Sequence, residues 1–211
     1  MGKRLSRHKQ KQLIMLFVAG STARTSAELV GVHRHTATRY FRRIRERIAT
    51  LPPPAPLMGH VEIDESYFGG IRKGRRGRGS QNKVPVLGMI ARGGEVAAVI
   101  IKNASADVLI PIIRKNVVSG SVVYTDKWRG YCSLPEYGYH HATICHAQNF
   151  AVGNIHVNGI ENFWSQAKRH MRRFNGIPPQ AFPLFLAECV WRFNNPSPRR
   201  QVMQVQHLMF R

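Results

Sequence analysis

HVEIDESYF, at residues 60–68, is the stretch from which the fold of this chain is best predicted. Val61 and Ile63 alternate with polar residues, so they share one face of an extended chain, because successive side chains of a β-strand point to opposite faces. Asp64 then points to the opposite face, together with Glu62. The pattern therefore predicts a β-strand with one face in a hydrophobic core and a rigidly held carboxylate near its middle.

Further strands and helices are predicted after this one. VPVLGMIA and EVAAVII, at 84–91 and 95–101, are strands joined by Arg92-Gly93-Gly94, which is a hairpin signal. SVVYTD is another strand that runs into a turn. Three strands, a helix, a strand and two helices indicate a mixed α/β domain over residues 59–200, with a C-terminal tail at 201–211. The segments with helical spacing are 107–115, 158–173 and 182–194.

The sequence before the first strand is predicted to be helical and basic. Residues 1–50 contain 12 Lys and Arg residues against two acids, Glu28 and Glu46. A helix around residues 13–18, a short one at 25–30, a turn at Gly31 and a longer helix at 34–48 form the outline of a helix-turn-helix DNA-binding domain. A plain basic helical hairpin is the alternative. Candidate base contacts lie early in the last helix, at His33, Arg34, His35, Thr36, Thr38 and Arg39.

A proline-rich segment separates the two regions. LPPPAP, at 51–56, contains three consecutive prolines, which cannot continue a helix and stiffen the chain into an extended spacer. We therefore expect a linker over residues 51–58.

The charge of the chain predicts a polyanionic partner. Its 211 residues include 32 Lys and Arg but only 11 Asp and Glu, a formal net charge of +21. Nucleic acid is the commonest partner of so basic a surface, although a ribosomal or merely basic protein has the same composition. A glycine-rich loop before Lys83 is a candidate clamp for a DNA backbone, or else a solvated surface loop. Its basic residues are Arg72, Lys73, Arg75, Arg76 and Arg78.

Compartment signals favour a cytoplasmic protein. No run of about 18 apolar residues predicts a membrane span. QLIMLFVA, at 12–19, superficially resembles the apolar part of a signal peptide but continues into a helical pattern, so we interpret it as a core helix. The three cysteines form no CxxC pair and are odd in number, which suits a reducing compartment.

Carboxylates are scarce, and three of them are placed where they can converge. Asp64 lies on the first strand, Asp126 ends an apolar strand, and Glu161 lies one turn into a helix. Converging carboxylates repel one another unless a cation compensates, and oxygen ligands without thiolates favour Mg²⁺ or Mn²⁺. Glu62 shares the face of Asp64 and is a candidate supporting group, whereas Glu65 points to the other face and is expected to be structural.

The helix that carries Glu161 is predicted to have two distinct sides. Successive side chains of a helix are rotated by about 100°, so one acidic and two basic side chains fall on one narrow stripe of this helix. That order suits an active-site carboxylate with two cationic side chains along a DNA backbone. A solvated polar face is the alternative. The stripe consists of Glu161, Ser165, Lys168 and Arg172. The adjoining apolar arc, expected to pack on the sheet, consists of Ile160, Phe163, Trp164, Ala167 and Met171.

Three blocks of the sequence resemble a known family. VEIDESYFGG (61–70), YTDKWRGY (124–131) and HVNGIENFWSQAKR (156–169) are similar to the catalytic blocks of bacterial insertion-sequence transposases of the DDE superfamily. FPLFLAECVWRFNNP (182–196) resembles the C-terminal block of a short group of these transposases. The similarity runs from about residue 10 to 200, and the three catalytic blocks are specific in combination.

The resemblance implies a fold, a chemistry and partners. It implies an RNase H-like sheet flanked by helices, with Asp64, Asp126 and Glu161 as a triad that holds two Mg²⁺ (or Mn²⁺) ions per active site. Lys168 matches the basic residue seven positions after the family's glutamate and joins Arg172 as a candidate DNA contact. The expected reaction is cleavage at the ends of an insertion sequence and joining of the 3′-hydroxyl ends to target DNA. The expected partners are terminal inverted repeats, target DNA and at least one further copy of the chain, in the bacterial cytoplasm at the nucleoid.

Departures from the family leave alternatives open. Longer relatives carry an N-terminal zinc ribbon, and this chain has no cysteine before Cys132. A structure-selective nuclease that cuts without joining, and an inert DNA-binding regulator, remain alternative functions. A zinc site is not expected, because the spacing of the candidate ligands fits no finger pattern. These are Cys132, His140, His141, Cys145, His146 and His156.

Overall fold

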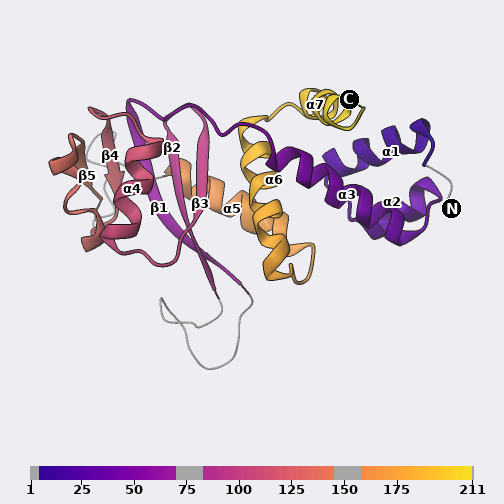
Figure 1. Cartoon of the computed structure of the whole chain (residues 1–211), viewed down its shortest axis with the longest axis horizontal. Coiled ribbons are helices and arrows are strands. Elements are labelled where there is room, and N and C mark those ends of the chain that lie inside the picture. The colour runs from indigo at the N-terminus through magenta and orange to yellow at the C-terminus, as the bar shows by residue number, and fades with distance from the viewer. Residues whose placement is uncertain (1–4, 70–82, 145–157, 211) are drawn as a thin grey trace. The chain divides into compact units, whose positions relative to one another are not determined.

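The computed structural model describes residues 5–69, 83–144 and 158–210 (Figure 1). The chain forms two compact units. The sheet unit is Pro53–Lys168, and the helical unit combines Met1–Pro52 with Arg169–Arg211. Helix α5 (Asn158–Arg172) contributes residues to both.

The sheet unit is built on five strands in the order β3-β2-β1-β4-β5 (Figure 1). Strands β1, β2 and β3 pair antiparallel, whereas β4 pairs parallel to β1 and to β5. This mixed sheet with flanking helices has the RNase H-like arrangement, so the predicted fold class is confirmed. The strands are β1 (His60–Phe68), β2 (Val84–Ala91), β3 (Val96–Ile100), β4 (Val122–Thr125) and β5 (His140–Thr143).

Helices cover the two faces of the sheet. Helix α4 (Ala106–Asn116) packs Leu109 and Ile113 into a core with Ile63 of β1. Helix α5 lies against the other face (Figure 1). Gly88 makes this approach possible, because a side chain there would collide with Ile160 and the indole of Trp164. Short 3₁₀ turns, Arg129–Tyr131 and Leu134–Tyr137, connect β4 to β5.

The helical unit begins with three capped helices. Ser6 and Thr22 accept backbone N–H groups at the starts of α1 (Arg7–Val18) and α2 (Ala23–Val30). Gly31 ends α2 in the left-handed conformation, with φ 63°, which permits the tight turn into α3 (Arg34–Ala49). The predicted pattern of helix, glycine turn and basic helix is therefore present.

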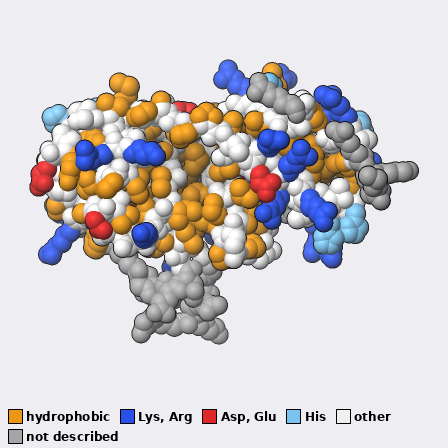
Figure 2. All heavy atoms as spheres, in the orientation of Figure 1, with side chains coloured by type: hydrophobic (Ala, Val, Ile, Leu, Met, Phe, Trp, Pro, Cys, Tyr) orange, Lys and Arg blue, Asp and Glu red, His pale blue; other side chains and the backbone are white. Residues whose placement is uncertain are grey.

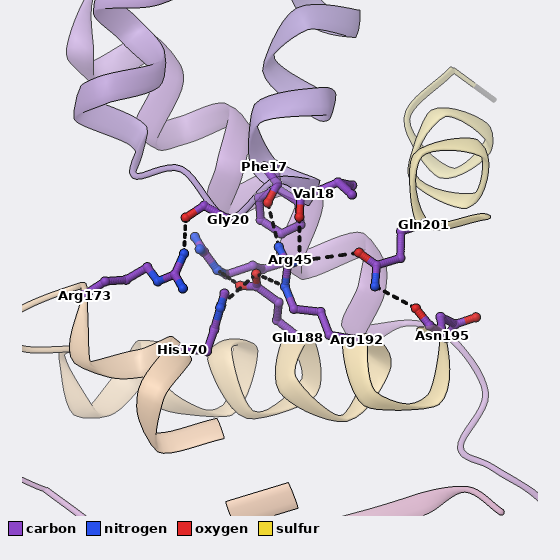
Figure 3. Close-up of polar contacts among 10 residues, drawn as sticks. All are labelled: Phe17, Val18, Gly20, Arg45, His170, Arg173, Glu188, Arg192, Asn195 and Gln201. Atoms are coloured by element: carbon purple, nitrogen blue, oxygen red, sulfur yellow. Dashed lines mark hydrogen bonds and ion pairs between the residues drawn. The ribbon is translucent and has the colours of Figure 1, made fainter. Parts of the chain in front are cut away.

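The C-terminal helices complete the core of the helical unit. Helix α6 (Phe182–Asn194) buries Trp191, and α7 (Pro198–Phe210) buries Val205 and Met209, in one cluster with the apolar residues of α1–α3. Polar contacts also join α3, α6 and the C-terminal end of α5 (Figure 3). A 3₁₀ turn at Pro179–Ala181 precedes α6.

Two elements differ from the expectations. Strand β5 is four residues without apolar alternation, and it exists because its backbone pairs with β4. The expected tail at 201–211 lies largely in helix α7, whose apolar spacing is weak and which is held by the contacts of Val205 and Met209. The compact units group residues 169–200 with the N-terminal helices, and the domain boundaries over 1–50, 51–58 and 59–200 stay a prediction.

No helix in the described parts of the chain is long and apolar enough to span a membrane.

Candidate active site

The parallel pairing of β1 and β4 brings two aspartates together. Glu62 of β1 pairs with Tyr124 of β4, and continuing this register by two residues places Asp126 beside Asp64. Asp126 directly follows β4, and its Oδ1 accepts the backbone N–H of Trp128 at 2.9 Å. The sheet itself therefore sets the separation of these two carboxylates.

Asp64 is held by a hydrogen bond from the opposite layer. The indole Nε1 of Trp164 donates to Asp64 Oδ2 at 3.1 Å. Burial raises the pKa of Asp64, and the negative charges of Asp126 and Glu161 raise it further. Asp126 and Glu161 thus both lie within electrostatic reach of Asp64.

Glu161 lies in the first turn of α5 on the exposed side of the helix. The two sides of α5 agree with the predicted pattern. The apolar arc of Ile160, Phe163, Trp164, Ala167 and Met171 is buried, and the polar stripe of Glu161, Ser165, Lys168 and Arg172 is exposed. The ammonium of Lys168 lies 5.9 Å from the ring centre of Phe68, the last residue of β1. The stripe therefore borders the end of the strand that carries Asp64.

The donor set suits a hard divalent cation. Among the described residues, no three His, Cys, Asp or Glu side chains are gathered closely enough to form a ready-made metal site. Asp64, Asp126 and Glu161 offer carboxylate oxygens only, which is the ligand type that Mg²⁺ and Mn²⁺ prefer. Burial, and to a smaller extent the charges of Asp126 and Glu161, raise the pKa of Asp64, and a bound cation would favour its charged form.

Trp164 and Glu65 are two residues whose environment the sequence only partly predicted. Trp164 was expected in the core, and it is buried, but it also orients Asp64. The signal was its position on the same α5 face as Ile160, which the sheet must cover. Glu65 points to the α4 side of the sheet, as expected, near Tyr131. Burial raises the pKa of Glu65 to about 7, and the charges of Asp126 and Asp64 add to this.

The predicted DNA contacts on α3 share one exposed surface. Arg34, His35, Thr38 and Arg39 are exposed, while Tyr40 is buried on the opposite side of the helix. Figure 2 shows many Lys and Arg side chains on the face of α1–α3 turned to the viewer. The predicted loop contacts Arg72, Lys73, Arg75, Arg76 and Arg78 lie outside the described residues.

The histidines considered for zinc have other environments where they are described. His140 and His141 lie on β5, and His141 Nε2 is 2.8 Å from Thr125 Oγ1. Burial lowers the pKa of His141. Cys132 is exposed with a free thiol. Cys145, His146 and His156 lie outside the described residues.

Sequence comparison identifies relatives over most of the sheet unit. Residues 56–194 match the ISXO2-like transposase domain. The chain is also 43% identical, over 115 residues, to an uncharacterized transposase-like protein of Haemophilus influenzae, and the match covers 54% of this chain and 94% of that protein.

Two solved structures are distantly similar. One is a chain of the simian T-cell lymphotropic virus intasome in complex with the PP2A regulatory subunit B56 gamma, with a TM-score of 0.43 and 12% identity, covering 88% of this chain and 69% of that one. The other is the Mos1 transposase paired-end complex with the left transposon end, with a TM-score of 0.28 and 12% identity, covering 97% and 81%. Both TM-scores are below 0.5, so neither structure supports a conclusion about this chain.

Proposed function

This chain belongs to the ISXO2-like family of DDE transposases, and from that premise we propose that it cuts DNA at the ends of an insertion sequence and joins the freed 3′-hydroxyl ends to target DNA. The observation that carries the proposal is that the negative charges of Asp126, directly after β4, and of Glu161 on α5 both act on Asp64 of the neighbouring parallel strand β1. A site of carboxylates only, on a basic protein, suits phosphodiester chemistry.

Asp64, Asp126 and Glu161 are the residues that would hold two Mg²⁺ or Mn²⁺ ions. When bound, such ions activate the attacking water or hydroxyl and stabilise the leaving oxygen. Asp64 is suited to binding such an ion, because a central strand and the Trp164 indole fix its carboxylate. Asp126, directly after β4, and Glu161 of α5 would supply further carboxylate oxygens.

The basic surfaces would position the DNA. We assign α2, the Gly31 turn and α3 as a helix-turn-helix, whose residues Arg34, His35, Thr38 and Arg39 read the terminal repeat. Lys168 and Arg172 on the exposed side of α5 would contact phosphates near the cut. The basic residues 72–78 supply a further backbone contact. Since two DNA ends must be joined in one event, the working assembly is at least a dimer.

The chemistry is tested with purified protein, terminal-repeat DNA, a plasmid target and Mg²⁺ or Mn²⁺. We expect cleavage and strand transfer in the wild type, and a fall in strand transfer of at least about 100-fold in Asp126→Asn. Loss of a metal ligand should lower activity more than loss of a residue that only hydrogen-bonds to a ligand, which typically costs about 10–100-fold. Asp107→Asn is the matched control, since Asp107 is an exposed aspartate on α4.

The outcomes separate the alternatives. Cleavage without joining would identify a nuclease, and DNA binding without cleavage would identify a regulator. Full strand transfer by Asp126→Asn would refute the proposed triad.

A further inference from the structure

Glu62 is a buried carboxylate that contacts the start of the helix carrying Glu161. Only 1% of its surface is exposed. Its Oε2 accepts the backbone N–H of Ile160 in the first turn of α5 at 3.1 Å, and its Oε1 accepts Arg92 Nε at 3.0 Å. The first N–H groups of a helix have no partner within the helix and carry its positive dipole end, so a carboxylate satisfies them well.

The absence of a side chain at Gly159 allows this contact. A Cβ atom at Gly159 would lie 2.9 Å from Glu62 Oε2, closer than side chains normally approach. Gly159 does not adopt a positive φ, so its backbone conformation does not require glycine. The missing side chain therefore serves the close approach of Glu62 to α5.

The partner of Glu62 is tied to the strand that leads to Asp126. The guanidinium of Arg92 lies 4.1 Å from the ring centre of Tyr124, and the Tyr124 hydroxyl is 2.8 Å from His60 Nδ1. Tyr124 is on β4, two residues before Asp126. Glu62 thus lies where β1, the β2–β3 turn, β4 and α5 meet, and these include all three elements that carry the predicted acids.

We propose that Glu62 is a positioning residue, which holds the first turn of α5 against β1 so that Glu161 stands beside Asp64. The role rests on the proposed transposase function. An ordinary cap comes from the residue just before a helix and fixes only that helix. Glu62 comes from β1, two residues from Asp64, and it therefore relates the helix acid to the strand acid directly.

Two variants disturb the contact in different ways. Glu62→Gln keeps the size of the side chain but replaces one carboxylate oxygen by an NH₂ group. The amide therefore cannot accept hydrogen bonds from both Arg92 and Ile160. Gly159→Ala keeps every polar group but pushes on Glu62 Oε2. The added Cβ must displace Glu62 Oε2 or the start of α5, so thermal unfolding is measured beside activity to separate a local displacement from a loss of the fold. Glu95→Gln, at an exposed glutamate in the β2–β3 turn, is the matched control.

The measurements are strand transfer over a range of Mn²⁺ concentrations, Mn²⁺ affinity by calorimetry, affinity for terminal-repeat DNA without metal, and thermal unfolding. For Glu62→Gln and Gly159→Ala, we expect strand transfer to fall about 10–100-fold, and the Mn²⁺ dissociation constant to rise by a similar factor, as when a supporting contact of a metal ligand is lost. DNA affinity without metal should be unchanged. Glu95→Gln should behave as the wild type.

The outcomes distinguish this role from the proposed function. If the wild type is active and both variants keep its activity and its Mn²⁺ affinity, the positioning role is wrong while the function stands. If the wild type neither cleaves DNA nor binds Mn²⁺, the function and the positioning role fail together. If Glu62→Gln does not fold, Gly159→Ala decides between these results.

Discussion

Asp64 is partly buried, and a single neighbouring side chain, that of Trp164, fixes its position. Its neighbour across the antiparallel pair is Gly88, and the space above this glycine is filled by the indole of Trp164. The indole N–H can therefore reach Asp64 Oδ2. This hydrogen bond fixes one carboxylate oxygen and favours the charged form of Asp64, which a metal ligand must adopt.

Trp164→Phe should weaken the site without unfolding the protein. The phenyl ring keeps most of the packing, but Asp64 loses its donor, and we expect Mn²⁺ affinity and strand transfer to fall about 10–100-fold. Calorimetry and the strand-transfer assay measure the two effects. Trp191→Phe is the control, because it also removes an indole hydrogen bond, to Gln204, but in the helical unit. Equal losses in both variants would contradict a specific role for Trp164.

Glu188 is the residue on which the polar centre of the helical unit depends (Figure 3). Its carboxylate is 1% exposed and accepts Arg45 Nε at 2.6 Å and Arg192 Nε at 2.8 Å, with His170 Nε2 at 3.0 Å. Arg192 also donates to backbone carbonyls at the end of α1. Removing one member leaves buried charge without compensation, which typically costs about 3–5 kcal/mol.

The stability of the helical unit should depend on pH through Glu188. Burial alone would raise its pKa, but His170, Arg45 and Arg192 outweigh burial and lower the pKa from 4.5 to about 2. Because the folded state prefers the ionised form, this stabilisation is complete above the unfolded pKa and is lost as pH falls toward 2. Glu188→Gln should therefore lower the free energy of unfolding at pH 7 by about 3 kcal/mol, and less at pH 3.

Urea unfolding at both pH values measures this difference. Glu46→Gln is the control, since Glu46 forms an exposed pair with Arg42 and should contribute only about 0–1 kcal/mol. An equal loss in Glu188→Gln at pH 7 and pH 3 would show that the low pKa does not stabilise the fold.

At the scale of elements, α3 and α5 each combine a packing side with a polar side. On α3 the buried side includes Phe41 and Ile44, while arginines occupy the exposed side. On α5 the buried side faces the sheet, and the exposed side carries Glu161 and Lys168. The same 3.6-residue period thus fixes which residues build the core and which are exposed, and the predicted DNA-contact and catalytic residues are among the exposed ones.

Arg39→Ala tests the proposed reading surface of α3. Arg39 is exposed on the helix predicted to enter the major groove, and we expect the affinity for terminal-repeat DNA to fall by about 1–3 kcal/mol, with a smaller effect on unrelated DNA. Fluorescence anisotropy at several salt concentrations measures both. Arg47→Ala, at the other end of α3, is the control. Equal weakening by the two variants would leave only a general electrostatic role.

At the scale of the whole molecule, the helical unit is assembled from both ends of the chain. Apolar residues of α1–α3 share one core with Trp191, Val205 and Met209. Arg45 of α3 depends on Glu188 of α6, 143 positions away, for its ion pair. The N-terminal helices therefore share their core with the two C-terminal helices.

A fragment of residues 1–52 should be largely unfolded. It lacks α6 and α7, so it exposes part of its core and leaves Arg45 without Glu188. Circular dichroism and thermal melting of the fragment, beside the full chain, test this. A cooperative transition of the fragment near that of the full chain would show that α1–α3 fold independently.

Much of the fold and part of the site were predictable because they depend on local spacing. Strand β1 follows from alternation, the β2–β3 hairpin from its glycines, and α3 and α5 from apolar residues at helical intervals. The exposure of Glu161 and Lys168 follows from the same period. The triad itself stays a prediction, based on these placements and on the family.

The tertiary structure alone decided what joins distant parts of the chain. Strand β5 and helix α7 have weak local patterns and are formed because β4 and the helical core bind them. The bonds from Trp164 to Asp64 and from Ile160 to Glu62 span 100 and 98 positions. No local pattern encodes such pairs. The sequence by itself determined which carboxylates are available. The packing of α5 on the sheet determined that Asp64 accepts a hydrogen bond from Trp164 and that Glu62 accepts one from the start of α5.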